Sequence, residues 1–344
     1  MGGSLGPARR FLTETLVASL GSLPGRFCGS RVAVCLSGGA DSCALALAVS
    51  DLGRERPELL PGVSALHVRH HLRGSESEGD AASVRELCGL AGLPLRELDA
   101  PVEPGPGLEA RARVARYGAL RREAPGSLLA TAHHRDDQAE TVVLRLLRGA
   151  GPRGLVGIRP IRQDGIWRPL LACGRDVLSE ACREADWIPR QDSSNADRTY
   201  SRNEIRWGLL PDWEQEQPGT AAALADLARA AWELEPFLER ALDRLDGELS
   251  VLGDERGFTL DLSRWPVDRP SPETDSEFES TLERAWTRRG RRPWTASHRS
   301  RLIADLWQGK TGRRRGGQAE IAHFGGRKLR VESSNTEGMA ENGH

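Results

Sequence analysis

The chain contains very little lysine. Its 48 basic residues include only two lysines, Lys310 and Lys328. A Walker A phosphate loop needs a lysine in its glycine-rich turn, so this class of nucleotide site is excluded. Glycine patterns of the dinucleotide-binding type occur at residues 149–154 and 105–110, but neither follows a good strand pattern. We therefore interpret both as turns.

Cysteine pairs and long apolar segments are also missing. None of the six cysteines belongs to a Cys-x-x-Cys pair, so neither a zinc ribbon nor a redox or iron–sulfur dithiol is supported. No apolar run approaches the ~20 residues that span a bilayer, and residues 1–10 lack the apolar core of a secretory signal. A chain of 344 residues with 28% charged residues is long enough for two domains. We expect a cytoplasmic protein that does not contact a membrane.

The net charge of −1 conceals two segments of opposite charge. Residues 212–280 hold six arginines against eighteen acids, a net charge of −12, whereas residues 281–331 reach +11. The basic segment includes Arg313, Arg314 and Arg315, and tryptophans lie among its charges. Such a composition is typical of a nucleic-acid-binding surface. The alternative is a solvated face whose charges pair with the acidic segment.

The strongest local signal is a glycine turn after a short apolar run. Residues 32–36 predict a strand that is buried on both faces, and an apolar helical pattern begins at Ala44. Between them the sequence reads Ser37-Gly38-Gly39-Ala40-Asp41-Ser42. A strand, a glycine turn and a helix N-terminus direct unpaired N–H groups and the helix dipole at an anion. A carboxylate next to phosphates is repelled by them unless a divalent cation or a developing positive charge is present. The position of Asp41 in this turn therefore indicates nucleotide chemistry.

Strands and helices alternate through the N-terminal half. The predicted elements are a helix at 11–23, strands at 63–68, 95–98 and 128–132, and helices at 76–90 and 108–122. This order predicts an α/β fold with a doubly wound parallel sheet and helices on both faces. Ligands of such sheets bind beyond the carboxyl ends of the strands. Polar motifs follow three predicted strands there, at residues 37–42, 67–73 and 133–137.

A helix predicted after His134 carries an apolar stripe formed by Ala139, Val142, Val143, Leu146 and Leu147, which we expect to face the core. Asp136 and Asp137 fall in its first turn, where helix capping would account for the presence of one of the two acids. Two adjacent acids beside two histidines at a strand end indicate a functional site instead.

The helix at 108–122 places Glu109, Arg113 and Arg116 on one face. This spacing fits a surface salt-bridge ladder. It equally allows Arg113 to face phosphates.

The ordered motifs resemble those of the tRNA(Ile)-lysidine synthetases, a family of N-type ATP pyrophosphatases with a PP-loop. They lie at residues 37–42, 67–73, 108–117, 130–141, 145–149, 168–171, 192–195 and 200–206. The resemblance covers about residues 30 to 210. The sequence departs from the family pattern at three positions. The family usually has asparagine at the position of Arg69, glycine at that of His71, and proline or aspartate at that of Ser193.

The resemblance implies a domain organisation and a reaction. A catalytic domain of the adenine nucleotide alpha hydrolase type would cover residues 1–210, and a smaller, mainly helical domain at 211–332 would recognise tRNA and substrate. Independently of the resemblance, the polar residues 333–344 predict a disordered tail. In the implied reaction ATP, with Mg²⁺, adenylates the C2 oxygen of the wobble cytidine in the CAU anticodon of tRNA(Ile). Free L-lysine then displaces AMP, which changes codon specificity from AUG to AUA, and the family precedent suggests a homodimer.

The resemblance also assigns residues. The loop at 37–42, comprising Ser37, Gly38, Gly39, Ala40, Asp41 and Ser42, would bind ATP. The implied catalytic residues are Asp41, Arg113, His133 and Asp137, with Asp41 as either a magnesium ligand or a base. Asp137 and Glu140 would bind lysine. Contacts with tRNA would come from Arg145, Arg148, Arg202 and Arg206. The basic composition described above, rather than the resemblance, adds Arg313, Arg314 and Arg315.

Two alternatives remain. A PP-loop enzyme for 2-thiolation of cytidine or uridine would need a cysteine pair or cluster, and NAD and GMP synthetases share only the loop. A non-catalytic RNA-binding protein would leave the acids, histidines and arginines at the strand ends unexplained.

Overall fold

The computed structural model describes residues 5–69, 75–102, 105, 107–190, 202–248, 250–254, 257–261, 278–284, 296–308, 310–315, 320–325 and 328–333. The chain divides into two compact units, Met1–Trp232 and Glu233–His344, which are taken separately below. The motif positions His70, His71 and Ser193 lie outside the described residues. So does the predicted tail, apart from Ser333.

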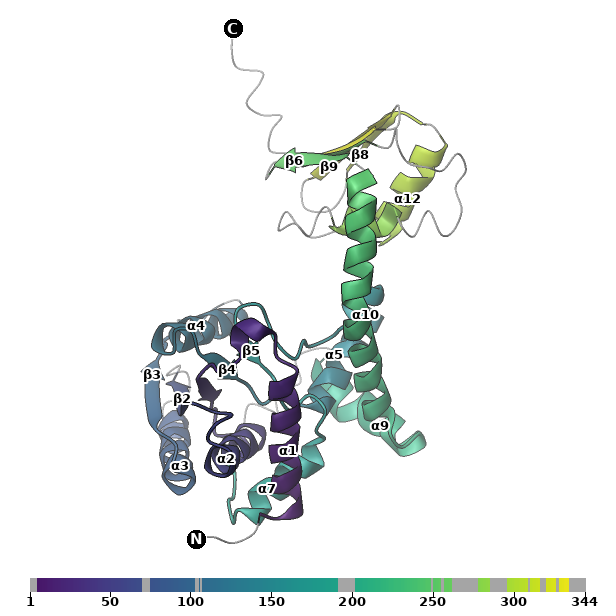
Figure 1. The fold of residues 1–344 in the computed structure, drawn as a ribbon. Coiled ribbons are helices and arrows are strands. Elements are labelled where there is room, and N and C mark those ends of the chain that lie inside the picture. Colours follow the sequence, from purple (N-terminus) through teal and green to yellow (C-terminus); the bar gives the residue numbers. More distant parts are fainter. Residues whose placement is uncertain are drawn as a thin grey trace. The chain divides into compact units, whose positions relative to one another are not determined.

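A five-stranded parallel sheet organises the N-terminal unit (Figure 1). Its strands are β1 (Val32–Cys35), β2 (Val63–Arg69), β3 (Leu95–Asp99), β4 (Leu128–Ala130) and β5 (Ile166–Trp167), in the order β3-β2-β1-β4-β5. Val32 of β1 lies opposite Val63 of β2 on one side and Leu128 of β4 on the other. The chain winds outward in both directions from β1, so the crevice between the ends of β1 and β4 is the topological switch point, where such sheets bind ligands.

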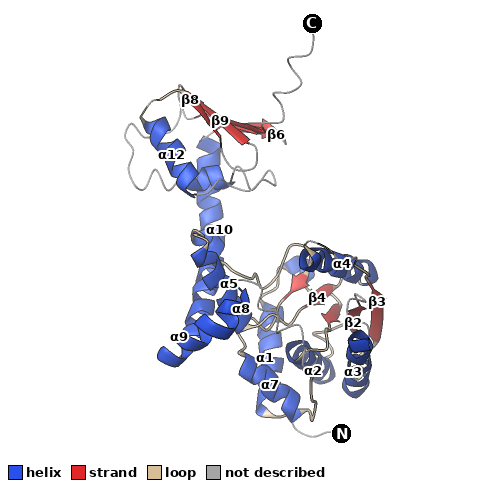
Figure 2. Cartoon of the chain, turned by 180° about the vertical axis from the view of Figure 1, so that it is seen from behind, coloured by secondary structure: helices blue, strands red, loops and turns tan. Residues whose placement is uncertain are grey.

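Helices cover both faces of this sheet, as the sequence predicts (Figures 1 and 2). One face packs against α1 (Pro7–Gly21), α2 (Ala40–Glu55), α3 (Ser75–Ala91) and α7 (Arg175–Glu184), and the other against α4 (Leu108–Glu123). Successive strand residues point to opposite faces. Val32 and Val34 therefore join the larger core with α2, while Ala33 joins Leu120 of α4 in the smaller one.

A second small core lies beside the sheet. It joins Ala139 and Val143 of α5 (Arg135–Leu147) to Ile205 of the π-helical turn η3 (Ile205–Leu209) and Leu210 of α9 (Leu210–Glu216). The predicted apolar stripe of α5 is only partly correct. Leu146 and Leu147 are 44% and 70% exposed, because this core ends before the last turn of the helix.

The remaining helices are short or extend beyond this unit. They are α6 (Pro152–Leu155), α8 (Arg202–Glu204) and α10 (Thr220–Glu248), which crosses the division between the units. Among the described residues, no helix has the length and apolar character needed to cross a membrane.

The C-terminal unit contains an antiparallel sheet that the sequence analysis did not anticipate. Its strands are β6 (Ser250–Asp254), β7 (Gly257–Asp261), β8 (Gly312–Arg315), β9 (Glu320–Gly325) and β10 (Lys328–Ser333), in the order β6-β7-β10-β9-β8. Helical residues 278–284 and α12 (Ala296–Trp307) accompany it. Along β10, Leu329 and Val331 are buried and Lys328 and Arg330 exposed, the period of two expected for a sheet with one solvated face.

Candidate functional site at the switch point

The glycine turn joins β1 to the N-terminus of α2. Gly38 has a φ of +94°, a conformation that favours glycine. The hydroxyl of Ser42 accepts a bond from the Ser37 backbone N–H at 3.2 Å, lies 3.0 Å from the Ser37 hydroxyl and donates to the Gly39 carbonyl at 2.9 Å. The N-cap of α2, Gly39, has no side chain that could cap the helix. The N–H groups of its first turn are therefore placed to receive an anion.

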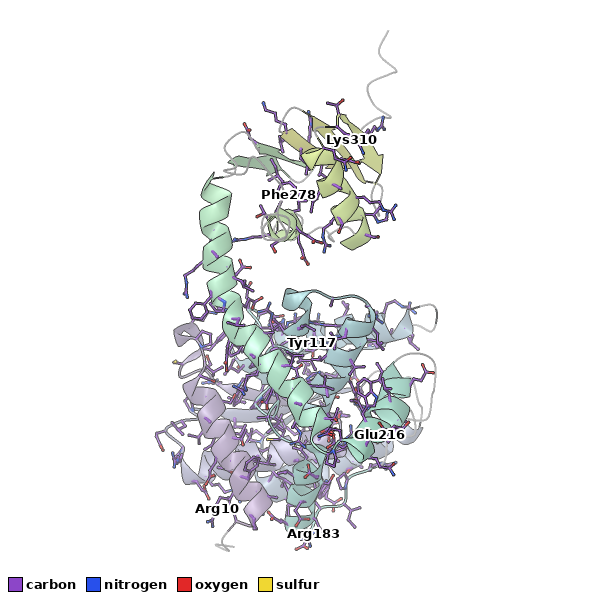
Figure 3. All side chains as sticks on the ribbon, turned by 90° about the vertical axis from the view of Figure 1, so that its right-hand side faces the viewer. Arg10, Tyr117, Arg183, Glu216, Phe278 and Lys310 are labelled. Carbon is purple, nitrogen blue, oxygen red and sulfur yellow. The ribbon has the colours of Figure 1, made fainter. Side chains whose placement is uncertain are left out.

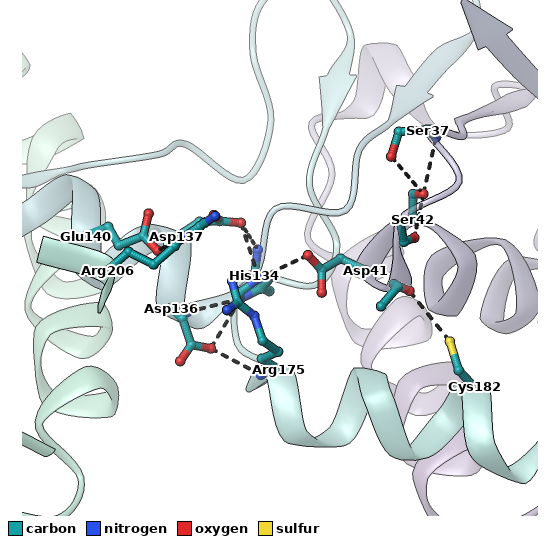
Figure 4. Close-up of polar contacts among 12 residues, drawn as sticks. Ser37, Asp41, Ser42, His134, Asp136, Asp137, Glu140, Arg175, Cys182 and Arg206 are labelled. Carbon is teal, nitrogen blue, oxygen red and sulfur yellow. Dashed lines mark hydrogen bonds and ion pairs between the residues drawn. The ribbon is translucent and has the colours of Figure 1, made fainter. Parts of the chain in front are cut away.

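Asp41 leaves this turn towards the end of β4, where His134 is completely buried (Figure 4). The Nε2 atom of His134 lies 3.5 Å from a carboxylate oxygen of Asp41 and 3.5 Å from one of Asp137. Its Nδ1 atom lies 3.2 Å from a carboxylate oxygen of Asp136. One imidazole thus contacts three carboxylates that come from two different strand ends.

Electrostatics favour the protonated form of this imidazole. Burial opposes its charge, but the contacts with Asp136, Asp41 and Asp137 outweigh it and raise the pKa of His134 to about 9. Burial likewise opposes ionisation of Asp136, yet His134 and the backbone N–H of Arg175 lower the pKa of Asp136 to about 2. The pKa of Asp41 is also lowered: burial opposes this, and the bond to His134 outweighs it. At neutral pH the cluster therefore holds an imidazolium beside the ionised carboxylates of Asp41 and Asp136.

The same imidazole marks the start of α5. As its N-cap, a neutral His134 accepts a bond from the Asp136 N–H at 3.2 Å, and Asp137 accepts one from the His134 backbone N–H at 3.1 Å. A protonated His134 instead donates from Nδ1 to the Asp136 carboxylate. In both states the histidine ties the acidic first turn of α5 to the switch point.

A second ion pair adjoins this cluster. Arg206 of η3 donates from Nε to Glu140 at 2.5 Å and from Nη2 to Asp137 at 2.9 Å. The Glu140 side chain is only 2% exposed and that of Asp137 13%. One buried carboxylate, Glu140, and one partly buried carboxylate, Asp137, thus already bind one guanidinium cation, and the Arg206 side chain is itself only 21% exposed.

The other predicted residues have different surroundings. The Nδ1 atom of His133 lies 2.9 Å from the Thr131 hydroxyl, and Arg113 stacks on the ring of Tyr117, 5.2 Å from its centroid. Arg145 donates to the Gly154 carbonyl at 2.6 Å, whereas Arg148 is exposed. Of Arg202 the structure gives only its place at the start of α8.

The basic segment of the C-terminal unit is partly neutralised within that unit. Arg313, Arg314 and Arg315 form most of β8, and Arg313 is exposed. Arg284, which is 3% exposed, pairs with Glu239 at 3.2 Å and with Asp243. Arg299 pairs with Glu279 at 2.9 Å. Acidic and basic segments of the sequence thus pair in part within this unit.

The sequence analysis chose His133 and did not single out His134. Both belong to one His-His-Arg-Asp-Asp motif. Which histidine is buried depends on where β4 ends and α5 begins, and the residue pattern does not fix that boundary. The helix cap was the available signal, since residue 134 directly precedes the acidic first turn.

The carboxylates of Asp41 and Asp137 suit a hard divalent cation. Both lie against the same Nε2 atom of His134, so one positive centre can contact both. Mg²⁺ is usually held by one or two carboxylates together with substrate phosphates rather than by an all-protein cage. Within the part of the chain that the structure describes, no three histidine, cysteine or acidic side chains are arranged so that they could hold a metal ion by themselves. The donor set fits Mg²⁺ that arrives with a nucleotide.

Several curated proteins are similar in sequence to this chain. Two curated relatives are the tRNA(Ile)-lysidine synthases of Solibacter usitatus, 43% identical over 236 residues, and of Pseudomonas putida, 38% identical over 237. The alignments cover 66% and 68% of this chain but 51% and 53% of those proteins. The chain thus spans about half the length of the curated relatives it matches.

A solved structure with a similar fold is the U34-tRNA thiolase NcsA from Methanococcus maripaludis with its [4Fe-4S] cluster. It has a TM-score of 0.52 and 16% sequence identity, and the match covers 66% of this chain and 79% of that one. A family model described as the PP-loop domain matches residues 12–213. That span holds the glycine turn, all five parallel strands and the carboxylate cluster, and the chain belongs to the PP-loop family.

Proposed function

We propose that the protein is an ATP-dependent ligase that joins the ε-amine of free L-lysine to C2 of the wobble cytidine in tRNA(Ile) with a CAU anticodon. The observation that carries the proposal is the placement of a phosphate-binding turn, the Asp41–His134–Asp137 cluster and a buried cation-binding pair, Asp137 and Glu140, at one switch point. An activating nucleotide and an amine nucleophile would both find their binding groups there. The names of the curated relatives support the same reaction.

In the first step the C2 oxygen of the cytidine attacks the α-phosphorus of ATP, and pyrophosphate leaves. The N–H groups after Gly39 bind the departing pyrophosphate. Arg113, which lies against Tyr117, contributes positive charge at longer range. When bound by Asp41 and Asp137, Mg²⁺ supplies further charge neutralisation on the phosphates. His134 holds these two carboxylates in place. The cytidine leaves its stack to reach this position.

In the second step the ε-amine attacks C2, and AMP departs with the former C2 oxygen. The incoming group must first be attracted as an ammonium ion and then lose a proton to become a nucleophile. Asp137 and Glu140 suit the attraction because they already stabilise one cation, the Arg206 guanidinium. Either carboxylate can accept the proton.

The direct test uses the purified chain with ATP, radiolabelled lysine and a tRNA(Ile) transcript carrying CAU. We expect label in the RNA, with one AMP and one pyrophosphate formed for each lysine attached. A transcript whose wobble cytidine is replaced by uridine is the matched control and should take up no label. Absence of labelled RNA with the CAU transcript would refute the proposal.

Thiolation is the second candidate, favoured by the fold similarity to a tRNA thiolase. Sulfur transfer uses thiolates. All six cysteines are free, and four are buried. Burial raises the pKa of Cys43, Cys88 and Cys173 to about 11 and that of Cys35 and Cys182 to about 12. These thiols are protonated at neutral pH, which favours ligation over thiolation.

A further inference from the structure

Three arginines lie within cation–π range of Tyr117. This residue, which is labelled in Figure 3, belongs to α4 and packs against the core on the face of the sheet that α4 covers. The guanidinium carbons of Arg113, Arg116 and Arg162 lie 5.2, 5.9 and 5.9 Å from the centroid of its ring. Two of these arginines come from α4, and Arg162 comes from the segment just before β5. At these distances the electron-rich ring attracts each guanidinium, and the N–H groups directed away from the ring can bind an oxyanion.

A fourth arginine supports this group from below the surface. Arg168 directly follows β5, is only 5% exposed and donates from Nη1 to the Arg159 carbonyl at 2.7 Å. Its Nε atom is buried without a hydrogen-bond partner. Burial and the nearby charges of Arg162 and Arg113 lower the pKa of Arg168, against the opposing effect of Tyr117. An incompletely satisfied guanidinium in such a position is costly unless an anion joins it.

Among the side chains that the structure describes, few carboxylates pair with these arginines. Asp164 pairs with Arg162 at 2.8 Å and with Arg121 at 2.6 Å. Among the residues whose side chains the structure describes, neither Arg113 nor Arg116 forms an ion pair with a carboxylate. Several like charges on one aromatic ring repel one another, so the arrangement suits an anionic ligand better than it suits the free protein.

We propose that Arg116, Arg162 and Arg168, arranged around Tyr117, form a binding site for a phosphodiester of the RNA backbone next to the reacting nucleotide. The site rests on the proposed function for its RNA ligand. The pyrophosphate of ATP already has its own site at the turn after β1, whereas β5 lies two strands away, about 10 Å across the sheet. An extruded nucleotide brings its flanking phosphates with it, and bidentate arginines recognise them well.

The test compares the wild-type chain with the double variant Arg116→Gln/Arg162→Gln. Arg56→Gln/Arg183→Gln is the control, since it removes two exposed arginines outside this group. Binding of a CAU tRNA(Ile) transcript is followed by fluorescence anisotropy between about 50 and 200 mM salt. We expect the dissociation constant of the test variant for tRNA to rise about tenfold. The negative slope of the logarithm of the association constant against the logarithm of the salt concentration should become shallower by about 1.4. The control should change neither.

The ATP dissociation constant of each variant, measured without RNA, distinguishes the two sources of phosphate. Unchanged ATP affinity with weakened tRNA binding supports the proposal. Weakened ATP binding with unchanged tRNA binding would overturn it and assign the arginines to the nucleotide. An unchanged salt slope would also overturn it. Because these binding measurements need no turnover, they remain valid if lysine attachment itself fails. A second variant, Arg168→Lys, keeps the positive charge but loses the planar guanidinium. It should weaken tRNA binding without unfolding the chain.

Discussion

The two units of this protein use charge in opposite ways. At the switch point of the N-terminal unit, His134 is fully buried and contacts three carboxylates, and Arg206 is enclosed by Asp137 and Glu140. In the C-terminal unit, Arg313, Lys328 and Arg330 are exposed on strands of the antiparallel sheet. Buried charges interact strongly because water does not screen them, whereas exposed charges are weakened by salt and act collectively.

This difference teaches what each region is suited to do. A buried, interlocked cluster can hold a few atoms in a fixed geometry for chemistry. An exposed basic surface suits graded, salt-dependent attraction of a polyanion. Single substitutions should therefore have large, specific effects in the first region and small, additive effects in the second.

The largest effect is expected for Asp41→Asn. The change keeps the shape of the side chain but removes the charge that faces His134 and the phosphate turn, so AMP formation should fall about a thousandfold or more. Asp176→Asn is the matched control because its carboxylate is 79% exposed on α7. Activity of Asp41→Asn equal to that of the control would remove Asp41 from the reaction.

The buried imidazolium predicts a pH dependence of stability. The pKa of His134 is raised from 6.5 to about 9 in the folded chain, so its stabilisation is complete below pH 6.5 and is lost as the pH rises through 9. It faces Asp41, Asp136 and Asp137, with Arg175 and Arg206 nearby. The free energy of unfolding should fall by on the order of 3 kcal/mol between these pH values.

Urea denaturation at successive pH values measures this loss. His134→Asn retains a side-chain acceptor at the N-cap but cannot become cationic, so its unfolding free energy should vary much less between pH 6.5 and 9. Parallel pH profiles for the two proteins would show that another group titrates. Measurements below pH 9 also avoid ionising the five cysteines whose pKa values burial raises to about 11 or 12.

A smaller effect is expected for Glu140→Gln. It removes one of the two carboxylates around the proposed ammonium position, so the KM for lysine should rise about 10- to 100-fold. Adenylation of tRNA, measured as pyrophosphate release without lysine, should be retained. Glu180→Gln on the exposed face of α7 is the control, and an equal loss in both steps would mean that Glu140 acts on the fold rather than on lysine.

The smallest effect per residue is expected for the basic edge of the C-terminal sheet. Changing Arg313, Arg314 and Arg315 together to serine should weaken tRNA binding about tenfold and reduce the salt slope by about 2, with ATP binding unchanged. Unchanged tRNA affinity throughout a salt titration would favour the solvated-face interpretation of this segment.

The parallel fold was predictable because its signals are local. The buried run before Ser37, the glycine turn and the following helix are read from neighbouring residues, and the strand–helix alternation predicts the sheet. The antiparallel sheet was not predicted, since its strands are short and its register joins segments such as 257–261 and 328–332, which lie far apart in the chain. The resemblance singled out Asp41 and Asp137, which the structure brings together, but not His134, the residue that both of them contact.

Sequence alone determined the glycine turn at residues 37–42, the strand and helix on either side of it, and the acidic start of α5. Each of these features depends on residues within a few positions of one another. Only the tertiary structure decided that His134 rather than His133 contacts Asp41. It also decided that Arg206 pairs with Glu140, which lies 66 residues earlier in the chain. The physical reason is that burial and ion pairing depend on which segments the sheet brings together. That arrangement follows from packing of the whole unit and not from any single motif.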